Sequence, residues 1–289
     1  MATLQLCAPL ISNDWLAQNL QADNLVLLDA TVPPIVHFTQ TRLPDHLHNQ
    51  GIPGARRFDY DQQVRDPRSS LPHMMPTAEM FAEEVRKLGI SNHSAVVIYD
   101  RTGVYASPRG WWMFRAMGHD NVAVLDGGLP AWWQAGLPMA ALIEAGDVAA
   151  GDFQSRPRDG WFCDAIAVYQ RLNDKGCVIL DARSAGRFAG RDPEPRPGLR
   201  GGHMPNARNL PFAAVLNDIH MKPVEELRKA LGPLLQPQQQ LITSCGSGLT
   251  ACILTLAAAL AGHERLSVYD GSWSEWGLPS KLPVVTDDV

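Results

Sequence analysis

The sequence predicts an α/β protein made of two similar domains in tandem, each a parallel sheet flanked by helices. Two observations support this prediction. Short apolar strands alternate with helical segments in each half of the chain, a pattern typical of parallel sheets that helices cover. The same series of features also occurs twice in the same order, which indicates an internal duplication.

The duplicated features begin with an apolar strand that ends in Asp-Ala. A proline-containing turn, an amphipathic helix, a second apolar strand and an Asp-Gly pair follow it. The matched segments are 25–30 and 177–182, 51–55 and 203–207, 78–88 and 224–231, 95–99 and 241–244, and 124–128 and 268–272. We therefore expect an N-terminal domain over residues 1–140, a linker over 141–160, where alanine, glycine and polar residues are common, and a C-terminal domain over 161–289.

The composition restricts the class of protein. The chain has 289 residues, of which 45% are hydrophobic and 19% charged, so it can bury a core in each domain. A net charge of -5 gives no general reason to expect a nucleic-acid partner. Apolar runs stay below the roughly 20 residues that span a bilayer, and no secretory signal is visible. Five scattered cysteines fit neither a disulfide framework nor a metal site, so we expect a cytoplasmic protein without a membrane partner or a metal.

One cysteine follows the carboxyl end of a predicted strand, which is where parallel sheets usually bind their ligands. Cys245 directly follows the predicted strand 241–244, and Gly246, Ser247 and Gly248 separate it from a predicted helix. Backbone N–H groups in such a loop, together with the positive end of the helix dipole, favour an anion at the sulfur. We therefore expect Cys245 to be a thiolate of low pKa and the catalytic nucleophile.

The other cysteines, Cys7, Cys163, Cys177 and Cys252, are expected to be small buried side chains. Phosphatase chemistry at Cys245 is disfavoured. Cysteine phosphatases bind the phosphate with an arginine six residues after the cysteine, and here that residue is Ala251.

Three motifs identify a resemblance to a known family. They are Cys-Gly-Ser-Gly-Leu-Thr-Ala at 245–251, Glu-Pro-Arg-Pro-Gly at 194–198 followed by Gly-His-Met-Pro at 202–205, and Tyr-Asp-Gly-Ser-Trp-Ser-Glu-Trp-Gly at 269–277. Over nearly its whole length the chain resembles the rhodanese superfamily, and within it the branch that acts on 3-mercaptopyruvate. Leu249 stands where the family usually has valine, and Asn206 where it usually has glycine.

The resemblance implies two tandem rhodanese-like domains and a sulfur-transfer reaction. Cys245 would take the sulfur of 3-mercaptopyruvate as a persulfide and release pyruvate. The sulfur would then pass to a thiol such as that of thioredoxin, or to cyanide, with no metal or organic cofactor. Two alternatives stay open, a thiosulfate sulfurtransferase and a sulfur carrier without turnover.

The residues after the nucleophile favour mercaptopyruvate over thiosulfate. Thiosulfate sulfurtransferases have two cations in this loop, which suit a dianion. Here Gly246 and Ser247 occupy those positions, and the serine offers a neutral hydroxyl. The loop residues Gly246, Gly248, Leu249 and Thr250 are expected to bind the substrate.

Family positions also assign substrate-binding arginines. Arg187 and Arg196 would hold the substrate carboxylate, because a guanidinium fork matches that group. Alternatively, most arginines of this segment are solvated surface charges. The arginines in question are Arg183, Arg187, Arg191, Arg196 and Arg200.

The first half of the chain is expected to contribute a proton relay. The resemblance places His73 and Asp61 beside Ser247, where they could move a proton, since histidine titrates near neutrality. Alignment of the strands sets Asp100 opposite Cys245, so the first domain is expected to be catalytically inactive. Trp111, Trp112 and Phe114, which follow in a predicted helix, are expected to pack in a core or against the other domain. A role for the first domain as an independent binding module stays an alternative.

Overall fold

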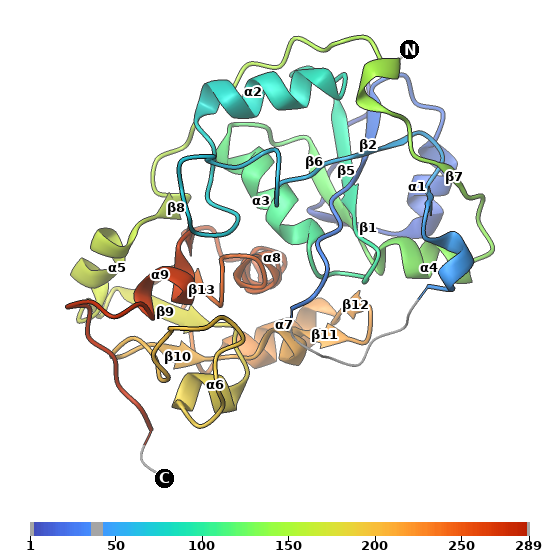
Figure 1. Cartoon of the computed structure of the whole chain (residues 1–289). Coiled ribbons are helices and arrows are strands. Elements are labelled where there is room, and N and C mark those ends of the chain that lie inside the picture. Colours follow the sequence, from blue (N-terminus) through green and yellow to red (C-terminus); the bar gives the residue numbers. More distant parts are fainter. Residues whose placement is uncertain (1–2, 36–42, 288–289) are drawn as a thin grey trace. The chain divides into compact units, whose positions relative to one another are not determined.

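A computed structural model of the chain describes residues 3–35 and 43–287, and its architecture is α/β (Figure 1). Two compact units are present. Unit 1 consists of the chain up to Asp66, Met75–Arg158 and Asn217–Met221, and unit 2 consists of Pro67–Met74, Asp159–Leu216 and the chain from Lys222 onward. Each unit is built around one parallel sheet flanked by helices, as the sequence predicts.

The sheet of unit 1 has the strand order β1-β6-β5-β2-β4, and each neighbouring pair is parallel. Its strands are β1 Leu10–Ile11, β2 Leu25–Asp29, β4 Ala55–Arg57, β5 Ala95–Tyr99 and β6 Val122–Leu125. Its helices are α1 Asn13–Asn19, α2 Ala78–Lys87, α3 Ser107–Ala116 and α4 Gly128–Gln134. Shorter elements are the 3₁₀ turns Asp45–Leu47 and Ala145–Asp147 and the paired strands β3 Gln50–Gly51 and β7 Ala140–Ala141.

Unit 2 has a sheet of strand order β10-β9-β13-β14-β8, again parallel at each neighbouring pair. Its strands are β8 Phe162–Cys163, β9 Cys177–Asp181, β10 Arg208–Asn209, β13 Gln240–Ser244 and β14 Leu266–Tyr269. Its helices are α5 Ala165–Arg171, α6 Ala185–Ala189, α7 Val224–Leu231, α8 Ala251–Ala261 and α9 Ser272–Trp276. A 3₁₀ turn at Phe212–Val215 precedes the short strands β11 Leu216–Asn217 and β12 His220–Met221.

The two sheets have the same topology. When the order in unit 2 is read from its other edge, β8-β14-β13-β9-β10, each strand corresponds to one strand of unit 1 in the same place along the chain. Strands β5 and β13 are therefore equivalent, and the residues that follow them are Asp100 and Cys245. The structure confirms the duplication that the sequence pattern predicts.

Local sequence explains where the key helices begin and end. The side chain of Thr77 accepts a hydrogen bond from the backbone N–H of Met80 and so caps α2. Helix α8, which follows the Cys245 loop, is buried over its first eight residues, because its sequence is apolar on every side. It ends at Gly262, whose φ of 100° is in the left-handed region that glycine adopts without strain.

Aromatic side chains fill the core of each unit. In unit 1 the predicted core residues Trp111, Trp112 and Phe114 are at most 1% exposed. In unit 2 the indole rings of Trp273 and Trp276 are fully buried, and both residues belong to α9. Short helices and strands thus gain much of their stability from large buried rings rather than from their own length.

The prediction that the remaining cysteines are buried is correct for Cys252 but wrong for Cys7, which is exposed. Cys7 precedes β1 in an extended segment, where a thiol need not face the core. Cys163 and Cys177 are half-buried at strand positions. In the part of the chain that the structure describes, no helix has both the length and the apolar character needed to cross a membrane.

Candidate active site

Cys245 lies at the carboxyl end of β13, at the start of the loop that leads into α8. The residue is 1% exposed. Two backbone hydrogen bonds fix the start of this loop: the carbonyl of Cys245 accepts from the N–H of Trp273 at 2.9 Å, and the carbonyl of Gly246 accepts from the N–H of Ser274 at 2.8 Å. The first turn of α9 therefore holds Cys245 in place.

Ser272 makes a second connection to Cys245. Its hydroxyl oxygen accepts a hydrogen bond from the backbone N–H of Cys245 at 3.1 Å and donates one to the carbonyl of Tyr269 at 2.8 Å. Its φ of 48° is in the left-handed region, which a residue with a Cβ rarely adopts. Strain of this kind persists where surrounding contacts enforce it, often at functional sites.

The loop after Cys245 presents unused backbone donors. Among the described residues, no acceptor is found for the N–H groups of Gly246, Ser247, Leu249 and Thr250, and none for the Ser247 hydroxyl, although Ser247 is only 6% exposed. Gly248 turns the loop with a φ of 72°. Buried donors without a protein partner are uncommon, and an anionic ligand would satisfy them.

Both predicted substrate-binding arginines approach this loop. A methyl group built on Gly246 would lie 3.3 Å from Nη2 of Arg187 and 3.7 Å from Nη1 of Arg196. Arg187 is in α6, whose first turn is capped by the hydroxyl of Ser184. The structure thus brings two guanidinium groups next to Gly246, the residue that follows Cys245, where they attract negative charge.

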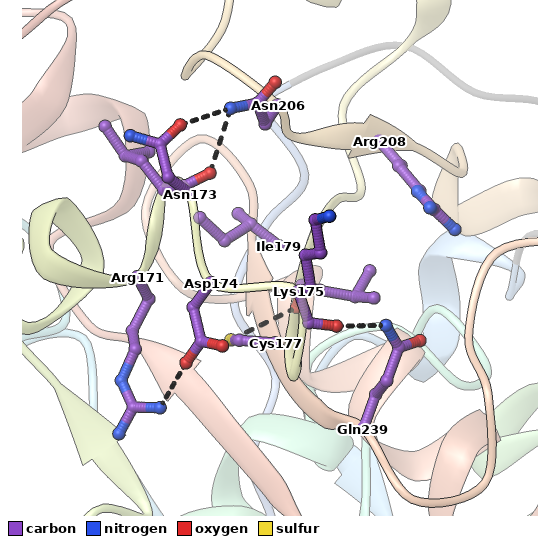
Figure 2. A pocket seen from close by; sticks show the side chains of 11 residues that line it. Arg171, Asn173, Asp174, Lys175, Cys177, Ile179, Asn206, Arg208 and Gln239 are labelled. Atoms are coloured by element: carbon purple, nitrogen blue, oxygen red, sulfur yellow. Dashed lines mark hydrogen bonds and ion pairs between the residues drawn. The ribbon is translucent and has the colours of Figure 1, made fainter.

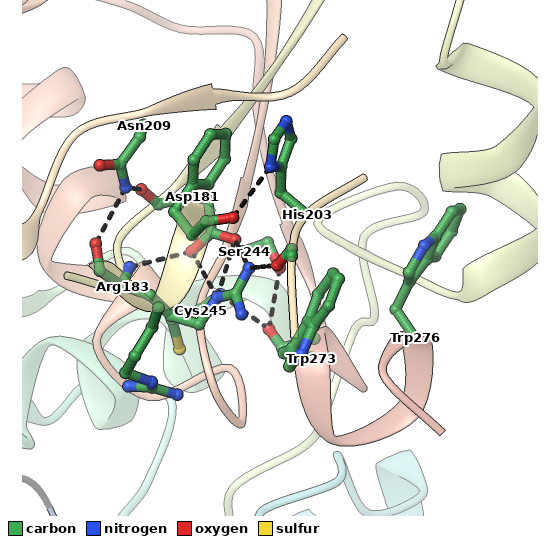
Figure 3. A network of polar contacts seen from close by, with 12 residues as sticks. Asp181, Arg183, His203, Asn209, Ser244, Cys245, Trp273 and Trp276 are labelled. Atoms are coloured by element: carbon green, nitrogen blue, oxygen red, sulfur yellow. Dashed lines mark hydrogen bonds and ion pairs between the residues drawn. The ribbon is translucent and has the colours of Figure 1, made fainter. Parts of the chain in front are cut away.

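A buried network of charges orients Arg187. The carboxylate of Glu194 accepts from Nη2 of Arg187 at 2.5 Å and from Nη1 of Arg183 at 2.7 Å, and its side chain is 2% exposed. Arg183 in turn contacts the carboxylate of Asp181 at 2.8 Å, and its guanidinium lies 4.0 Å from the centre of the Trp273 ring (Figure 3). Strand end, arginine and carboxylate are therefore one connected unit beside Cys245.

The two residues expected from the first half of the chain fall in different units. His73 is 4% exposed and has a φ of 61°. It lies in the segment Pro67–Met74, which belongs to unit 2, the unit that also contains Ser247 and Cys245. Asp61 belongs to unit 1, where its Oδ2 accepts a hydrogen bond from Nε2 of Gln62 at 2.7 Å.

Asp100, at the position equivalent to Cys245, is enclosed by its own loop. One carboxylate oxygen accepts from the N–H of Thr102 at 2.9 Å. The other accepts from the N–H groups of Tyr105, Ala106 and Ser107 and from the Ser107 hydroxyl, at 2.7–3.0 Å. Burial raises the pKa of Asp100, and these hydrogen bonds act in the opposite direction. The loop of unit 1 therefore already contains a carboxylate where unit 2 leaves donors unused.

Sequence reasoning missed four members of the site, Asp181, Arg183, Glu194 and Ser272. Asp181, Arg183 and Glu194 are buried and paired, although the arginine segment could be interpreted as solvated. Glu194 begins the Glu-Pro-Arg-Pro-Gly motif, but no spacing rule says that its carboxylate joins two arginines. Ser272 lies in an Asp-Gly-Ser context, which could have signalled a position equivalent to Gly128, whose φ is 52°.

No group of three or more potential metal-ligating side chains occurs within residues 3–35 and 43–287. The chemistry available at this site is that of a buried thiol, a loop of N–H donors and two arginines.

Comparison with known proteins identifies the family. Residues 12–135 and 164–278 each match the model of the rhodanese-like domain. The chain belongs to the rhodanese-like family. Each match contains the main strands of one sheet, so the duplication is a pair of rhodanese-like domains.

Curated rhodanese-like relatives extend over almost the whole chain. The 3-mercaptopyruvate sulfurtransferase of Homo sapiens is 37% identical over 286 residues, which cover 96% of this chain and 94% of the human one. The protein of that name from Escherichia coli strain K12 is 34% identical over 277 residues and covers 95% and 96%. A thiosulfate/3-mercaptopyruvate sulfurtransferase of Arabidopsis thaliana, named as mitochondrial, is 36% identical, with 96% of this chain and 78% of the plant chain covered.

Solved rhodanese-like structures agree with this fold. The crystal structure of SseA from Escherichia coli, which is described with the 3-mercaptopyruvate sulfotransferases, has a TM-score of 0.78 at 30% identity and covers 93% of this chain and all of its own. Tum1 from Saccharomyces cerevisiae has a TM-score of 0.83 at 29% identity and covers 97% of this chain and 98% of its own.

Proposed function

We propose that this protein is a sulfurtransferase that moves sulfur from 3-mercaptopyruvate, through a persulfide on Cys245, to a thiol or to cyanide. One observation carries the proposal: Arg187 and Arg196 face Gly246, next to a buried cysteine whose loop has unused N–H donors. A donor with a carboxylate at one end and a sulfur at the other fits this arrangement. The names of the human and bacterial relatives agree with it.

The first half-reaction breaks the bond between carbon and sulfur in the donor. Sγ of the Cys245 thiolate attacks the substrate sulfur and forms an S–S bond, while the electron pair of the C–S bond stays on carbon as an enolate. The enolate carbon takes up one proton and becomes pyruvate. The substrate thiol gives up one proton, so the proton count balances and the persulfide is left as an anion. The loop N–H groups and the dipole of α8 favour the anionic sulfur before and after the attack.

We further propose that Ser247, with His73 and Asp61, moves that proton. The support is that the Ser247 hydroxyl has no partner among the described residues, and that His73 is buried in a strained backbone conformation. In the second half-reaction a thiolate, such as that of thioredoxin, attacks the outer sulfur of the persulfide. The acceptor leaves with the sulfur, and the Cys245 thiolate is restored.

The organisation of the chain is part of the proposal. The N-terminal domain over 1–140 is catalytically inactive, because Asp100 cannot carry a persulfide, and residues 141–160 link it to the catalytic domain over 161–289. The protein is proposed to be cytoplasmic, since its five cysteines are unpaired, as is usual in a reducing compartment.

The decisive experiment compares the wild type with Cys245→Ser. We expect the variant to release no pyruvate from 3-mercaptopyruvate and to gain no sulfur by intact-mass analysis, while its thermal unfolding is unchanged. Cys252→Ser, which replaces the other buried cysteine of the same segment, serves as the matched control and should retain activity. Pyruvate release by Cys245→Ser at the wild-type rate would refute the proposal.

The donor is tested separately. The ratio of kcat/KM for 3-mercaptopyruvate to that for thiosulfate should favour mercaptopyruvate, because neutral residues follow Cys245. A preference for thiosulfate would make the protein a thiosulfate sulfurtransferase, and sulfur loading without turnover to any acceptor would make it a carrier.

A further inference from the structure

A second polar pocket lies in unit 2, at the opposite end of β9 from Asp181. It has a volume of about 430 Å³ and is formed by the end of α5, the turn that follows it and the start of β9, together with Asn206, Arg208 and Gln239 (Figure 2). The chemistry proposed above is at the carboxyl ends of the strands, whereas this pocket is at their amino ends. It is therefore a separate site.

The pocket carries an excess of positive charge. Arg171, Lys175 and Arg208 line it, and Asp174 is the acid among the lining residues. Arg265 is close enough to lower the pKa of Asp174, although it is not a lining residue. In a chain whose net charge is -5, such a local excess of cations is not explained by composition.

The single acid of the lining is already engaged. Oδ2 of Asp174 accepts from Nη1 of Arg171 at 2.8 Å, and Oδ1 accepts from the N–H of Gly176 at 2.8 Å. The backbone hydrogen bond of Gly176 and the bond from Arg171 lower its pKa, so it is ionised at neutral pH. Lys175 makes no ion pair with any described residue. Its ammonium group is available to a ligand.

Hydrogen bonds from polar side chains stabilise the walls of this pocket. Nδ2 of Asn206 donates to the carbonyl of Leu172 at 3.0 Å and to Oδ1 of Asn173 at 2.9 Å. Nε2 of Gln239 donates to the carbonyl of Lys175 at 2.8 Å. Figure 2 shows these contacts on both sides of the hollow. The pocket is thus held open by its own hydrogen bonds, which reduces the cost of ordering on binding.

Asn206 forms part of one wall of the pocket in an uncommon backbone conformation. Asn206 has a φ of 63°, in the left-handed region where glycine is favoured and asparagine is tolerated. The carboxamide of Asn206 joins this wall to Asn173. The side chain therefore builds part of the pocket at a position where glycine would leave the wall without this contact.

We propose that this pocket binds a small organic or inorganic polyanion, bearing phosphate or several carboxylate groups, through Lys175, Arg208 and Arg171. The size suits a small molecule, since ligand pockets are about 300–1,000 Å³. Two or more negative charges are required, because the cations outnumber the acid and no second carboxylate among the lining residues competes for them.

The test is equilibrium dialysis of the full chain with radiolabelled inorganic phosphate at low ionic strength, where screening is weak. We expect the double variant Lys175→Gln/Arg208→Gln to bind phosphate about tenfold more weakly or worse, since two charge-assisted contacts are lost. Lys229→Gln, which removes an exposed cation of α7 outside the pocket, should change the affinity by less than about twofold. Arg208→Lys, which keeps the charge, should retain most of the binding.

Phosphate could also bind the arginines next to Cys245, so Arg187→Gln is measured in parallel. Retention of phosphate binding in Arg187→Gln and its loss in the double variant would support the proposal. Loss in Arg187→Gln with unchanged binding by the double variant would overturn it, as would wild-type binding by both. Competition with citrate and with glycerol 3-phosphate then separates carboxylate from phosphate-ester occupants. Displacement by neither would refute the polyanion assignment. Thermal unfolding of each variant shows that binding, and not folding, has changed.

Discussion

Glu194 provides a sharp test of how the charge network supports catalysis. Its buried carboxylate joins Arg183 to Arg187, and Arg187 faces Gly246. The substitution Glu194→Gln keeps the shape of the side chain and one acceptor oxygen but removes the charge. It also turns an amide NH₂ group toward one of the two guanidinium groups, which can no longer be paired on that side.

The expected loss of stability in Glu194→Gln follows from the burial of this ion pair. Breaking a buried ion pair by removing one partner costs about 3–5 kcal/mol, because the remaining charge is left in a poor solvent. Arg183 keeps its contact with Asp181 at 2.8 Å, so we expect the lower end of that range, about 3 kcal/mol. For a chain of this size each kcal/mol lowers Tm by about 2–4 °C, which gives a decrease of about 6–12 °C.

Catalysis should respond through substrate binding. Arg187 loses the partner that orients it, and a lost charge-assisted contact of about 1.4 kcal/mol raises KM for 3-mercaptopyruvate about tenfold. We expect kcat to change less, since the thiol and its loop are untouched. Circular dichroism melting and steady-state pyruvate release measure the two effects.

Glu225→Gln is the matched control. Glu225 pairs with Arg228 at 2.6 Å in α7, but its side chain is 75% exposed, so the same chemical change should cost less than about 0.5 kcal/mol. A Tm decrease in Glu194→Gln no larger than in Glu225→Gln would contradict the buried-network argument. An unchanged or lower KM would show that Glu194 does not position Arg187.

Three further predictions concern other contacts of the two units. Ser272→Ala and Ser272→Gly both remove the acceptor of the Cys245 N–H, so both should lower kcat. The glycine variant should be about 1 kcal/mol more stable than the alanine variant, because the backbone at this position has a positive φ. Equal stabilities of the two variants in thermal melting would argue against strain at this position. Gly246→Ala should raise KM with little change in Tm, because the new methyl group would crowd the guanidinium groups, whereas Gly146→Ala, which meets nothing within 4 Å, should be silent in both assays. The hydrogen bond to Asp126 raises the pKa of His220, with burial opposing it and Asp218 adding to it, so this pair stabilises unit 1 fully below the unfolded pKa of about 6.5 and loses its effect as the pH rises through the folded pKa. His220→Gln should accordingly lower Tm at acidic pH and converge with the wild type at alkaline pH, and a Tm difference independent of pH would count against the pair.

Much of the fold could be predicted from the sequence because its information is local or repeated. Strand β5 is a continuous apolar run, β13 contains the apolar pair Leu241 and Ile242, and the helix after Cys245 ends at Gly262, where the apolar pattern stops. The duplication then supplied the correspondence between Asp100 and Cys245, which strand order confirms. The types of element, the parallel sheets and the duplication were therefore accessible without coordinates, whereas the order of the strands in each sheet was not.

The charge network could not be predicted in this way. Asp181, Arg183 and Glu194 meet because a strand end, a turn and a loop converge, and spacing along the chain does not specify which carboxylate pairs with which arginine. Exposure is equally non-local. Cysteine is a residue type that is usually buried, but Cys7 lies in a segment outside the core and is exposed.

The loop of unit 1 differs from the equivalent Cys245 loop in what occupies its hydrogen-bond donors. Asp100 gives its own carboxylate to the donors of Thr102, Tyr105, Ala106 and Ser107. Because the Asp100 carboxylate is covalently attached, its occupancy of the loop does not depend on any ligand concentration. The carboxylate does not leave, so this loop is permanently in the occupied state. In the proposed reaction the Cys245 loop cycles between an empty and a charged form, whereas the Asp100 loop stays in one form, so one copy of the fold would serve as a rigid structural element while the other turns over.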